Sequence, residues 1–91
     1  MADEFRAWIE KYLAHLGSER RLSRHTVVNY RRDLTALIAF CDKQDVSAWR
    51  QLDSFHIRQF AAADNRAGLA PRSIQRRLSA VRSFFRYLIR E

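Results

Sequence analysis

The sequence predicts an all-α protein, a compact four-helix bundle, and three observations support this fold class. Glycine and proline are scarce, at two and one in 91 residues, which disfavours sheets joined by tight turns. Hydrophobic residues make up 47% of the chain, which is enough for a core. Apolar residues recur at helical spacing in successive stretches. A chain of this length makes one small domain, which we expect to occupy residues 1–91.

The first helix is expected from about Asp3 to Gly17. Asp3 and Glu4 in its first turn suit the positive end of the helix dipole. Gly17 is the predicted C-terminal stop, because glycine readily takes the left-handed conformation that ends many helices. The apolar stripe of this helix consists of Phe5, Trp8, Ile9, Tyr12, Leu13 and Leu16.

The second helix is expected from about Arg24 to Lys43, with Ser23 as its N-cap. Its buried stripe consists of Val27, Tyr30, Leu34, Leu37, Ile38 and Cys41. The opposite face carries His25, Asn29, Arg32, Ala36 and Lys43. Asn29 has a donor and an acceptor on one amide, as readout of a base edge requires. A merely exposed asparagine is the alternative reading of that residue.

The third helix is predicted from about Ser54 to Ala67, after a connection over residues 44–52. Asp53 or Ser54 can cap its start, and Gly68 suits the left-handed conformation after its end. The apolar residues expected to point inward from this helix and from the connection before it are Ile57, Phe60 and Trp49.

The last helix is predicted to start at Pro71. Proline has no backbone N–H, and the N–H at the first helical position would have no partner within the helix. Its apolar stripe consists of Ile74, Leu78, Val81, Phe85 and Leu88. The opposite stripe consists of Arg72, Arg76, Ser79, Ser83, Arg86 and Arg90. Small serines let a partner come close and arginines hold a polyanion, so this helix is interpreted as lying against nucleic acid. An ordinary solvated basic face is the alternative. Arg76→Ala is expected to change the free energy of unfolding by no more than about 0.5 kcal/mol, as surface substitutions usually do.

The positive charge is confined to two segments. The net charge is +7, yet residues 20–32 hold five arginines and no acid, and residues 71–91 hold six arginines and one acid. The rest of the chain is slightly acidic. This distribution is typical of a protein with a polyanionic partner on one side. Helices that lie on membranes surround a fully exposed apolar face with cations, whereas here the apolar faces are needed for the core.

The residue types that carry catalysis or bind metals form no constellation in the sequence. His15, His25 and His56 fall on three separate predicted helices, and Cys41 is the single cysteine. No glycine-rich loop that would hold a nucleotide phosphate is present. We therefore expect no metal, no cofactor and no catalytic residue. The chain lacks an apolar run of signal-peptide or membrane-spanning length, so a soluble, intracellular protein is expected.

Two segments resemble the signatures of the N-terminal core-binding domain of tyrosine recombinases, the phage-integrase family. The first signature is matched by LSRHTVVNYRRDLTALIAFC, at Thr26, Tyr30, Leu34 and Phe40. The second signature is matched by RSIQRRLSAVRSFFRYL, at Ser73, Arg77, Leu78, Ser79, Ala80, Val81, Arg82, Phe84, Phe85 and Leu88. The combination of SERRLSRHTVVNYRRDL with RRLSAVRSFF is similar to the XerC-type subgroup in particular.

The resemblance implies a SAM-like four-helix bundle that forms one half of a clamp around double-stranded DNA, with its second and fourth helices toward the major groove. It implies a XerD-like partner, a role in chromosome dimer resolution, and a separate C-terminal catalytic domain that this chain lacks. Arg32, Arg72 and Arg76 are expected to hold phosphates, and Asn29 is the candidate for a base edge. The full set of expected DNA-binding residues is Arg24, His25, Thr26, Asn29, Arg32, Arg72, Ser73, Arg76, Arg77, Ser79 and Ser83.

Two other classes of function fit the composition. One is a self-contained helix-turn-helix regulator, which needs a short recognition helix after a turn of three or four residues, and the predicted last helix is long for that role. The other is a helical adaptor for an acidic protein or lipid surface. Binding to duplex DNA, compared with binding to acidic vesicles, separates the adaptor from the DNA-binding domain.

Overall fold

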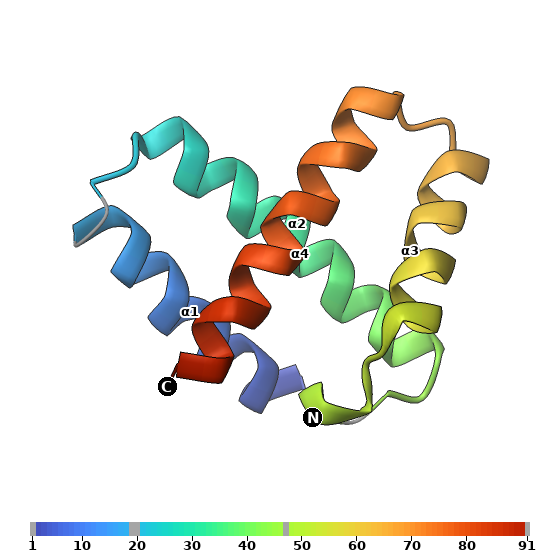
Figure 1. The fold of residues 1–91 in the computed structure, drawn as a ribbon, viewed down its shortest axis with the longest axis horizontal. Helices are drawn as coiled ribbons and strands as arrows, with labels where there is room; N and C mark the ends of the chain where they lie inside the picture. The colour runs from blue at the N-terminus through green and yellow to red at the C-terminus, as the bar shows by residue number, and fades with distance from the viewer. Residues whose placement is uncertain (1, 19–20, 47, 91) are drawn as a thin grey trace.

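A computed structural model describes residues 2–18, 21–46 and 48–90 of the chain. Within these residues every regular element is a helix and there is no strand, as the sequence predicts. The elements, shown in Figure 1, are α1 (Ala2–Ser18), α2 (Arg24–Lys43), the short 3-10 helix η1 (Trp49–Gln51), α3 (Ser54–Arg66) and α4 (Pro71–Arg90).

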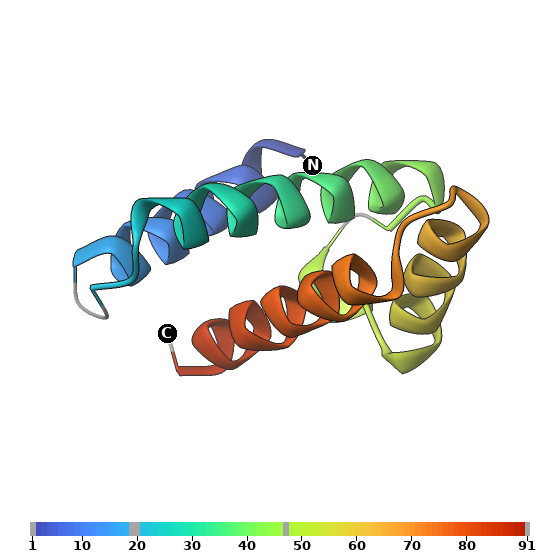
Figure 2. The same cartoon turned by 90° about the horizontal axis from the view of Figure 1, so that it is seen from above.

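The helices are arranged in two layers. Figure 2 shows α1 beside α2 in one layer, with α3 and α4 in the other. In Figure 1, α4 crosses in front of α2. The N-terminal halves of α2 and α4 diverge from this crossing toward the top of the view, so the starts of the two helices lie on the same side of the molecule.

The core lies between the layers and confirms most of the apolar positions predicted for the first two helices. Trp8, Val27 and Tyr30 are half-buried at its margins. The buried apolar residues of α1 and α2 are Phe5, Ile9, Tyr12, Leu13, Leu16, Leu34, Leu37, Ile38 and Cys41.

Trp49 of η1 packs into the core, as the sequence predicts. Its ring stacks on Phe5 of α1 with centroids 3.6 Å apart. It also meets Phe84 of α4 edge-on, with centroids 4.9 Å apart. Edge-to-face contacts such as that with Phe84 contribute beyond the area that they bury. The connection between α2 and α3 is thereby fastened to both layers.

The predicted N-caps are present in the structure. The Ser23 hydroxyl accepts a hydrogen bond from the backbone N–H of Thr26 at 3.2 Å. The Asp53 carboxylate accepts one from the backbone N–H of His56 at 3.1 Å, which lowers the pKa of Asp53. Each cap satisfies one of the N–H groups that a helix start leaves unpaired.

The C-terminal end of α3 is also as predicted, whereas the predicted stop of α1 is wrong. Gly68 follows α3 with φ of +89°, and the N–H groups of Gly68 and Leu69 bond back to the carbonyls of Asn65 and Asp64, which is a Schellman motif. Gly17 instead lies inside α1, which continues to Ser18.

The buried face of α4 differs from the predicted stripe. Ala80, Val81 and Phe84 are its fully buried residues, whereas Phe85 is half-buried. Apart from Val81, the other predicted stripe residues are also half-buried: Ile74, Leu78 and Leu88. The reason is that α4 packs against three helices at once, so its buried face is set by all three, and it includes the small residue Ala80, which is 0% exposed. A prediction from hydrophobicity alone therefore centres the buried face of α4 too close to Leu78 and too far from Ala80 and Phe84.

Candidate nucleic-acid interface

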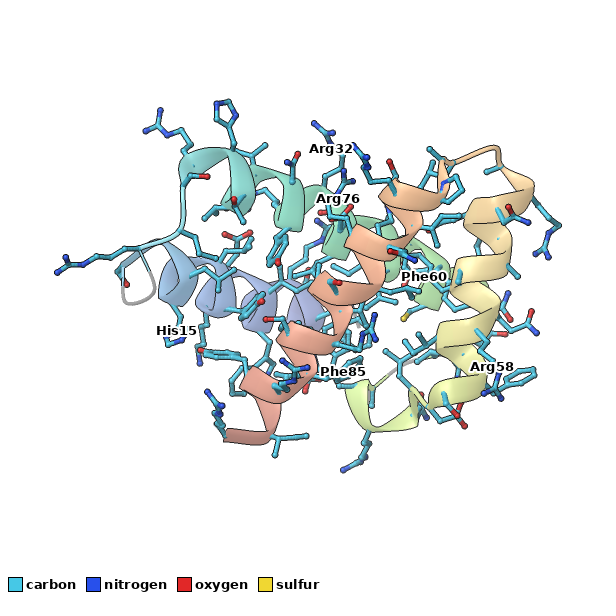
Figure 3. All side chains as sticks on the ribbon, turned by 45° about the horizontal axis from the view of Figure 1, so that its top comes forward. His15, Arg32, Arg58, Phe60, Arg76 and Phe85 are labelled. Carbon is cyan, nitrogen blue, oxygen red and sulfur yellow. The ribbon has the colours of Figure 1, made fainter. Side chains whose placement is uncertain are left out.

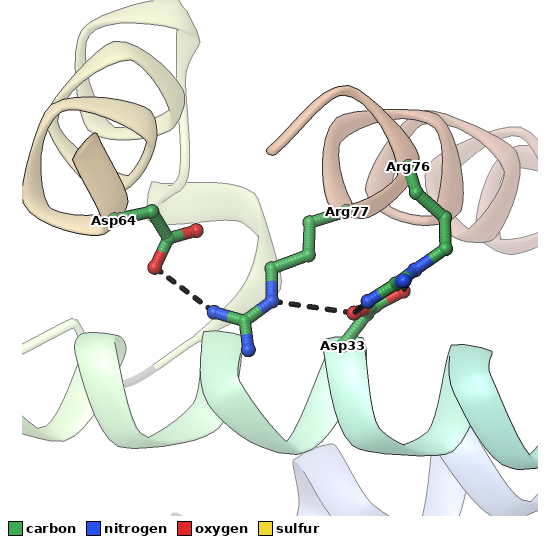
Figure 4. Close-up of polar contacts among 4 residues, drawn as sticks. All are labelled: Asp33, Asp64, Arg76 and Arg77. Atoms are coloured by element: carbon green, nitrogen blue, oxygen red, sulfur yellow. Dashed lines mark hydrogen bonds and ion pairs between the residues drawn. The ribbon is translucent and has the colours of Figure 1, made fainter. Parts of the chain in front are cut away.

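An ion pair joins α2 to α4 on the side where both helices begin. Arg76 donates from Nε to Asp33 Oδ2 and from Nη2 to Asp33 Oδ1, each at 3.0 Å (Figure 4). Asp33 is fully buried, whereas 36% of the Arg76 side chain is exposed. The hydrogen bonds to Asp33 raise the pKa of Arg76 above its usual value, so the guanidinium stays charged at any physiological pH.

A second arginine extends this pair to α3. Arg77 donates from Nε to Asp33 Oδ1 at 3.2 Å and from Nη1 to Asp64 Oδ1 at 2.9 Å. Only 15% of the Arg77 side chain is exposed. We call Asp33, Asp64, Arg76 and Arg77 the carboxylate–arginine cluster. It ties together three helices and balances two negative charges against two positive ones.

The cluster corrects the expected placement of Arg76 and Arg77. The sequence predicts that both face a partner and that Arg76 lies on the polar stripe of the last helix. In the structure Arg77 points between the helices, and Arg76 is shared between Asp33 and the surface. A buried carboxylate needs a cation beside it, and this requirement outweighs the tendency of arginine to lie in solvent.

Sequence reasoning missed both acids of the cluster, although the sequence contains a signal for one of them. Asp33 lies three residues after Tyr30 and four before Leu37, and thus within the buried stripe of α2. Arg77 has the same spacing between Ile74 and Val81. An acid and a base in equivalent positions of two apolar stripes predict a buried ion pair. Asp64 gives no comparable signal.

The expected DNA-binding residues of α2 divide into exposed and half-buried groups. Arg24, His25 and Arg32 are exposed, and Figure 3 shows Arg32 on the same side of the molecule as Arg76. Thr26 and Asn29 are half-buried. The Thr26 hydroxyl lies 3.0 Å from the hydroxyl of the N-cap Ser23, so it helps to hold the start of α2.

The expected residues of α4 are less uniformly exposed. Arg72 and Ser79 lie in solvent and Ser73 is half-buried. Ser83 does not lie on the outer face, because its hydroxyl accepts a hydrogen bond of 2.6 Å from the Tyr12 hydroxyl of α1. The polar residues of α4 that are exposed but absent from the expected set are Gln75, Arg82, Arg86 and Arg90.

Ion pairing reduces the positive charge that the two basic segments present to a partner. Arg31 pairs with Glu10 of α1, in addition to the pairs of Arg76 and Arg77. Among the described residues, the exposed arginines of these segments that pair with no carboxylate are Arg21, Arg24, Arg32, Arg72, Arg82, Arg86 and Arg90. The surface therefore stays basic, but its charge is smaller than the residue count indicates.

Other chemistry finds little support in the described residues. They contain no group of three histidine, cysteine, aspartate or glutamate side chains arranged to hold a metal ion. None of their helices has both the length and the apolar character needed to cross a bilayer. Cys41 is fully buried. Burial is the main cause that raises its pKa to about 11, and the negative charge of Asp42 contributes less.

Comparison with known proteins gives a consistent result. Residues 9–91 match the family described as phage integrase, N-terminal SAM-like domain. The chain is 48% identical over 83 residues to tyrosine recombinase XerC of Pseudomonas syringae pv. syringae, covering 91% of this chain and 28% of that protein. It is 47% identical over 89 residues to tyrosine recombinase XerC of Xanthomonas campestris pv. campestris, covering 98% and 28%.

The chain thus spans 28% of the length of these curated relatives. No solved structure matches it significantly. The family match extends over most of the chain, includes both segments that resemble the recombinase signatures, and agrees with the all-helical fold. The chain therefore belongs to the phage integrase N-terminal SAM-like domain family.

Proposed function

We propose that this chain is the DNA-binding N-terminal domain of a XerC-like site-specific tyrosine recombinase and forms one half of a clamp around the recombination site. The observation that supports this most directly is the position of three exposed arginines. Arg24 and Arg32 lie in the N-terminal half of α2, and Arg72 lies in the first turn of α4. These halves start on the same side of the molecule (Figure 1).

Such an arrangement suits a DNA backbone. Arginine neutralises phosphates with the release of counterions, and this supplies most of the affinity for duplex irrespective of sequence. The helix starts add positive dipole ends on the same side. The cluster beneath them links α2, α3 and α4, so the spacing between the two sets of arginines is fixed before DNA arrives.

The similarity to tyrosine recombinase XerC supports a proposal for the biological role. We propose that the whole protein acts with a XerD-like recombinase on double-stranded DNA in the bacterial cytoplasm, in chromosome dimer resolution. In this proposal the catalytic residues belong to a separate C-terminal domain. This chain contributes binding and orientation on the site, with no cofactor.

A helix-turn-helix regulator makes a different prediction about α2. Residues 67–70 form a four-residue turn between α3 and α4. A helix-turn-helix protein would read the DNA bases with the start of α4 alone. The clamp instead requires both helices. Arg32→Ala therefore separates these two functions, because it weakens duplex binding only if α2 contacts the DNA.

The test is a titration of fluorescently labelled duplex with the 91-residue chain at several salt concentrations. We expect a dissociation constant of about 10⁻⁴ to 10⁻⁶ M at physiological salt, and log K that falls linearly with log salt. Arg32→Ala and Arg72→Ala should each weaken binding and reduce the salt slope by about one. Arg58→Ala, on α3 and away from Arg32 and Arg76 in Figure 3, is the matched control.

Three results would count against the proposal. Binding that does not depend on salt would exclude phosphate contacts as its source. Equal losses in Arg58→Ala and Arg32→Ala would mean that the effect is one of net charge and not of a defined surface. Tighter binding to vesicles of acidic lipid than to duplex would favour the adaptor.

A further inference from the structure

We infer that Asp33 is a positioning residue for DNA binding, which holds one edge of the Arg76 guanidinium so that its other edge is presented to a phosphate. This inference rests on the proposed function and deepens it. It assigns a role in binding to a residue that is itself fully buried and does not contact DNA.

The geometry of the ion pair supports the inference. A guanidinium has five N–H groups in a planar fork. In the described structure Arg76 uses Nε and Nη2, which share one edge, and it gives both hydrogen bonds to Asp33. The N–H groups of Nη1 and the second one of Nη2 point away from that edge. The Arg76 side chain is 36% exposed whereas Asp33 is at 0%, so a ligand in solvent can reach Arg76 but not the carboxylate.

Arg77 provides an internal comparison. It bonds to the same Asp33 oxygen but is also held by Asp64, and only 15% of its side chain is exposed. Both sides of its guanidinium are thus occupied by carboxylates. The two adjacent arginines have separate tasks, since Arg77 joins the helices and Arg76 joins the helices while remaining accessible.

The inference changes what Arg76 contributes to binding. The four charges of the cluster cancel, so Arg76 adds little to the long-range attraction of DNA. Its contribution is instead directional, because its hydrogen-bond donors are already aimed when a phosphate arrives. A flexible lysine carries the same charge but lacks the fixed fork, and it cannot hold the carboxylate and a phosphate in one rigid arrangement.

The experiment compares lysine and glutamine substitutions at two arginines of the same surface. At Arg32, which has no carboxylate partner in the described structure, Arg32→Lys should bind duplex nearly as wild type does and Arg32→Gln should bind more weakly. At position 76, Arg76→Lys should lose affinity almost as much as Arg76→Gln, by about tenfold. Circular dichroism melts establish that each variant is folded at the temperature of the titration.

A double-mutant cycle tests the role of Asp33. By charge alone, Asp33→Asn would strengthen binding to a polyanion, whereas the inference requires it to weaken binding. The loss should disappear when Asp33→Asn is made in the Arg76→Gln background, because the carboxylate then has no guanidinium to aim. A purely structural effect of Asp33 would persist in that background.

The outcomes distinguish this inference from the proposed function. If wild type binds duplex and Arg32→Gln weakens it, but Arg76→Lys binds as wild type does, the proposed function stands and the inference fails. Stronger binding by Asp33→Asn also overturns it. Absence of wild-type binding overturns both. If Asp33→Asn does not fold, the comparison of Arg76→Lys with Arg32→Lys still decides the matter.

Discussion

The carboxylate of Asp33 in α2 accepts two hydrogen bonds of 3.0 Å from Arg76 in α4, at a point where Asp33 is completely enclosed. The same carboxylate accepts a third bond from Arg77. Three charge-assisted bonds give both oxygens of this buried acid a partner, so this site is a structural joint between the layers. Arg76 is therefore not the solvated surface arginine that the helical stripe indicates.

Loss of the buried acid should destabilise the domain strongly. Asp33→Ala leaves two guanidiniums without their shared carboxylate and should cost about 3–5 kcal/mol of the free energy of unfolding. Arg76→Ala should cost about 1–2 kcal/mol, since Asp33 keeps Arg77. Arg72→Ala, on the exposed surface, is the control and should stay within about 0.5 kcal/mol. Urea unfolding measures all three, and a neutral Asp33→Ala would mean that the cluster does not hold the helices together.

The buried face of α4 can be located by two further substitutions. Phe84→Ala removes a ring that is 0% exposed and in contact with Trp49, and should cost about 3–5 kcal/mol. Leu78→Ala should cost less, because Leu78 is half-buried and its removal leaves a site that water can fill. Thermal melts that rank Leu78→Ala as the more damaging change would place the core on the face predicted from hydrophobicity alone.

Local rules gave most of the fold from sequence. The caps at Ser23 and Asp53 and the turn at Gly68 depend on interactions within a few residues, and the apolar stripe of α1 follows from the helical period alone. The prediction of Gly17 as a stop failed because glycine also occurs inside helices, where it costs some stability but breaks no hydrogen bond.

The candidate site was less predictable because its residues are sorted by tertiary contacts. Neighbouring sequence could not distinguish Arg72, which is exposed, from Arg76, which lies on the same predicted stripe but bonds to a buried acid of another helix. The same holds for Ser79 and Ser83, which lie one turn apart on α4. Hydrophobic periodicity places a helix against a core but says little about which polar residues the core requires.

The single cysteine predicts a pH dependence of stability. Burial raises the pKa of Cys41 from 9.0 to about 11, so the unfolded chain loses this proton first as the pH rises. The contribution of the protonated thiol to the free energy of unfolding is fully present below pH 9 and is lost progressively as the pH rises toward 11. Urea unfolding across this range should show a steeper decline for wild type than for Cys41→Ala. Identical slopes in the two proteins would mean that the thiol titrates normally.

Asn29 is the candidate for reading a base edge, and the prediction concerns discrimination and not overall affinity. An amide can make two hydrogen bonds to adenine, which is worth about 1–3 kcal/mol against the wrong base. Asn29→Ala should therefore weaken binding to a cognate recombination site but hardly affect scrambled duplex, whereas Arg72→Ala should weaken both alike. Competition between the two duplexes measures this. If wild type shows no preference for the cognate site, this domain reads only shape and charge.

The two serines of α4 should respond in opposite ways to the same substitution. The Ser83 hydroxyl accepts a 2.6 Å hydrogen bond from Tyr12, which ties α4 to α1, whereas Ser79 is exposed. Ser83→Ala should cost about 0.5–1.5 kcal/mol of the free energy of unfolding and leave duplex affinity unchanged. Ser79→Ala should leave stability within about 0.5 kcal/mol, and it should lower duplex affinity if α4 faces the DNA with this side. Melting curves and duplex titrations on both variants give the four values. A loss of affinity in a stable Ser83→Ala protein would show that the hydroxyl turns away from Tyr12 to meet DNA.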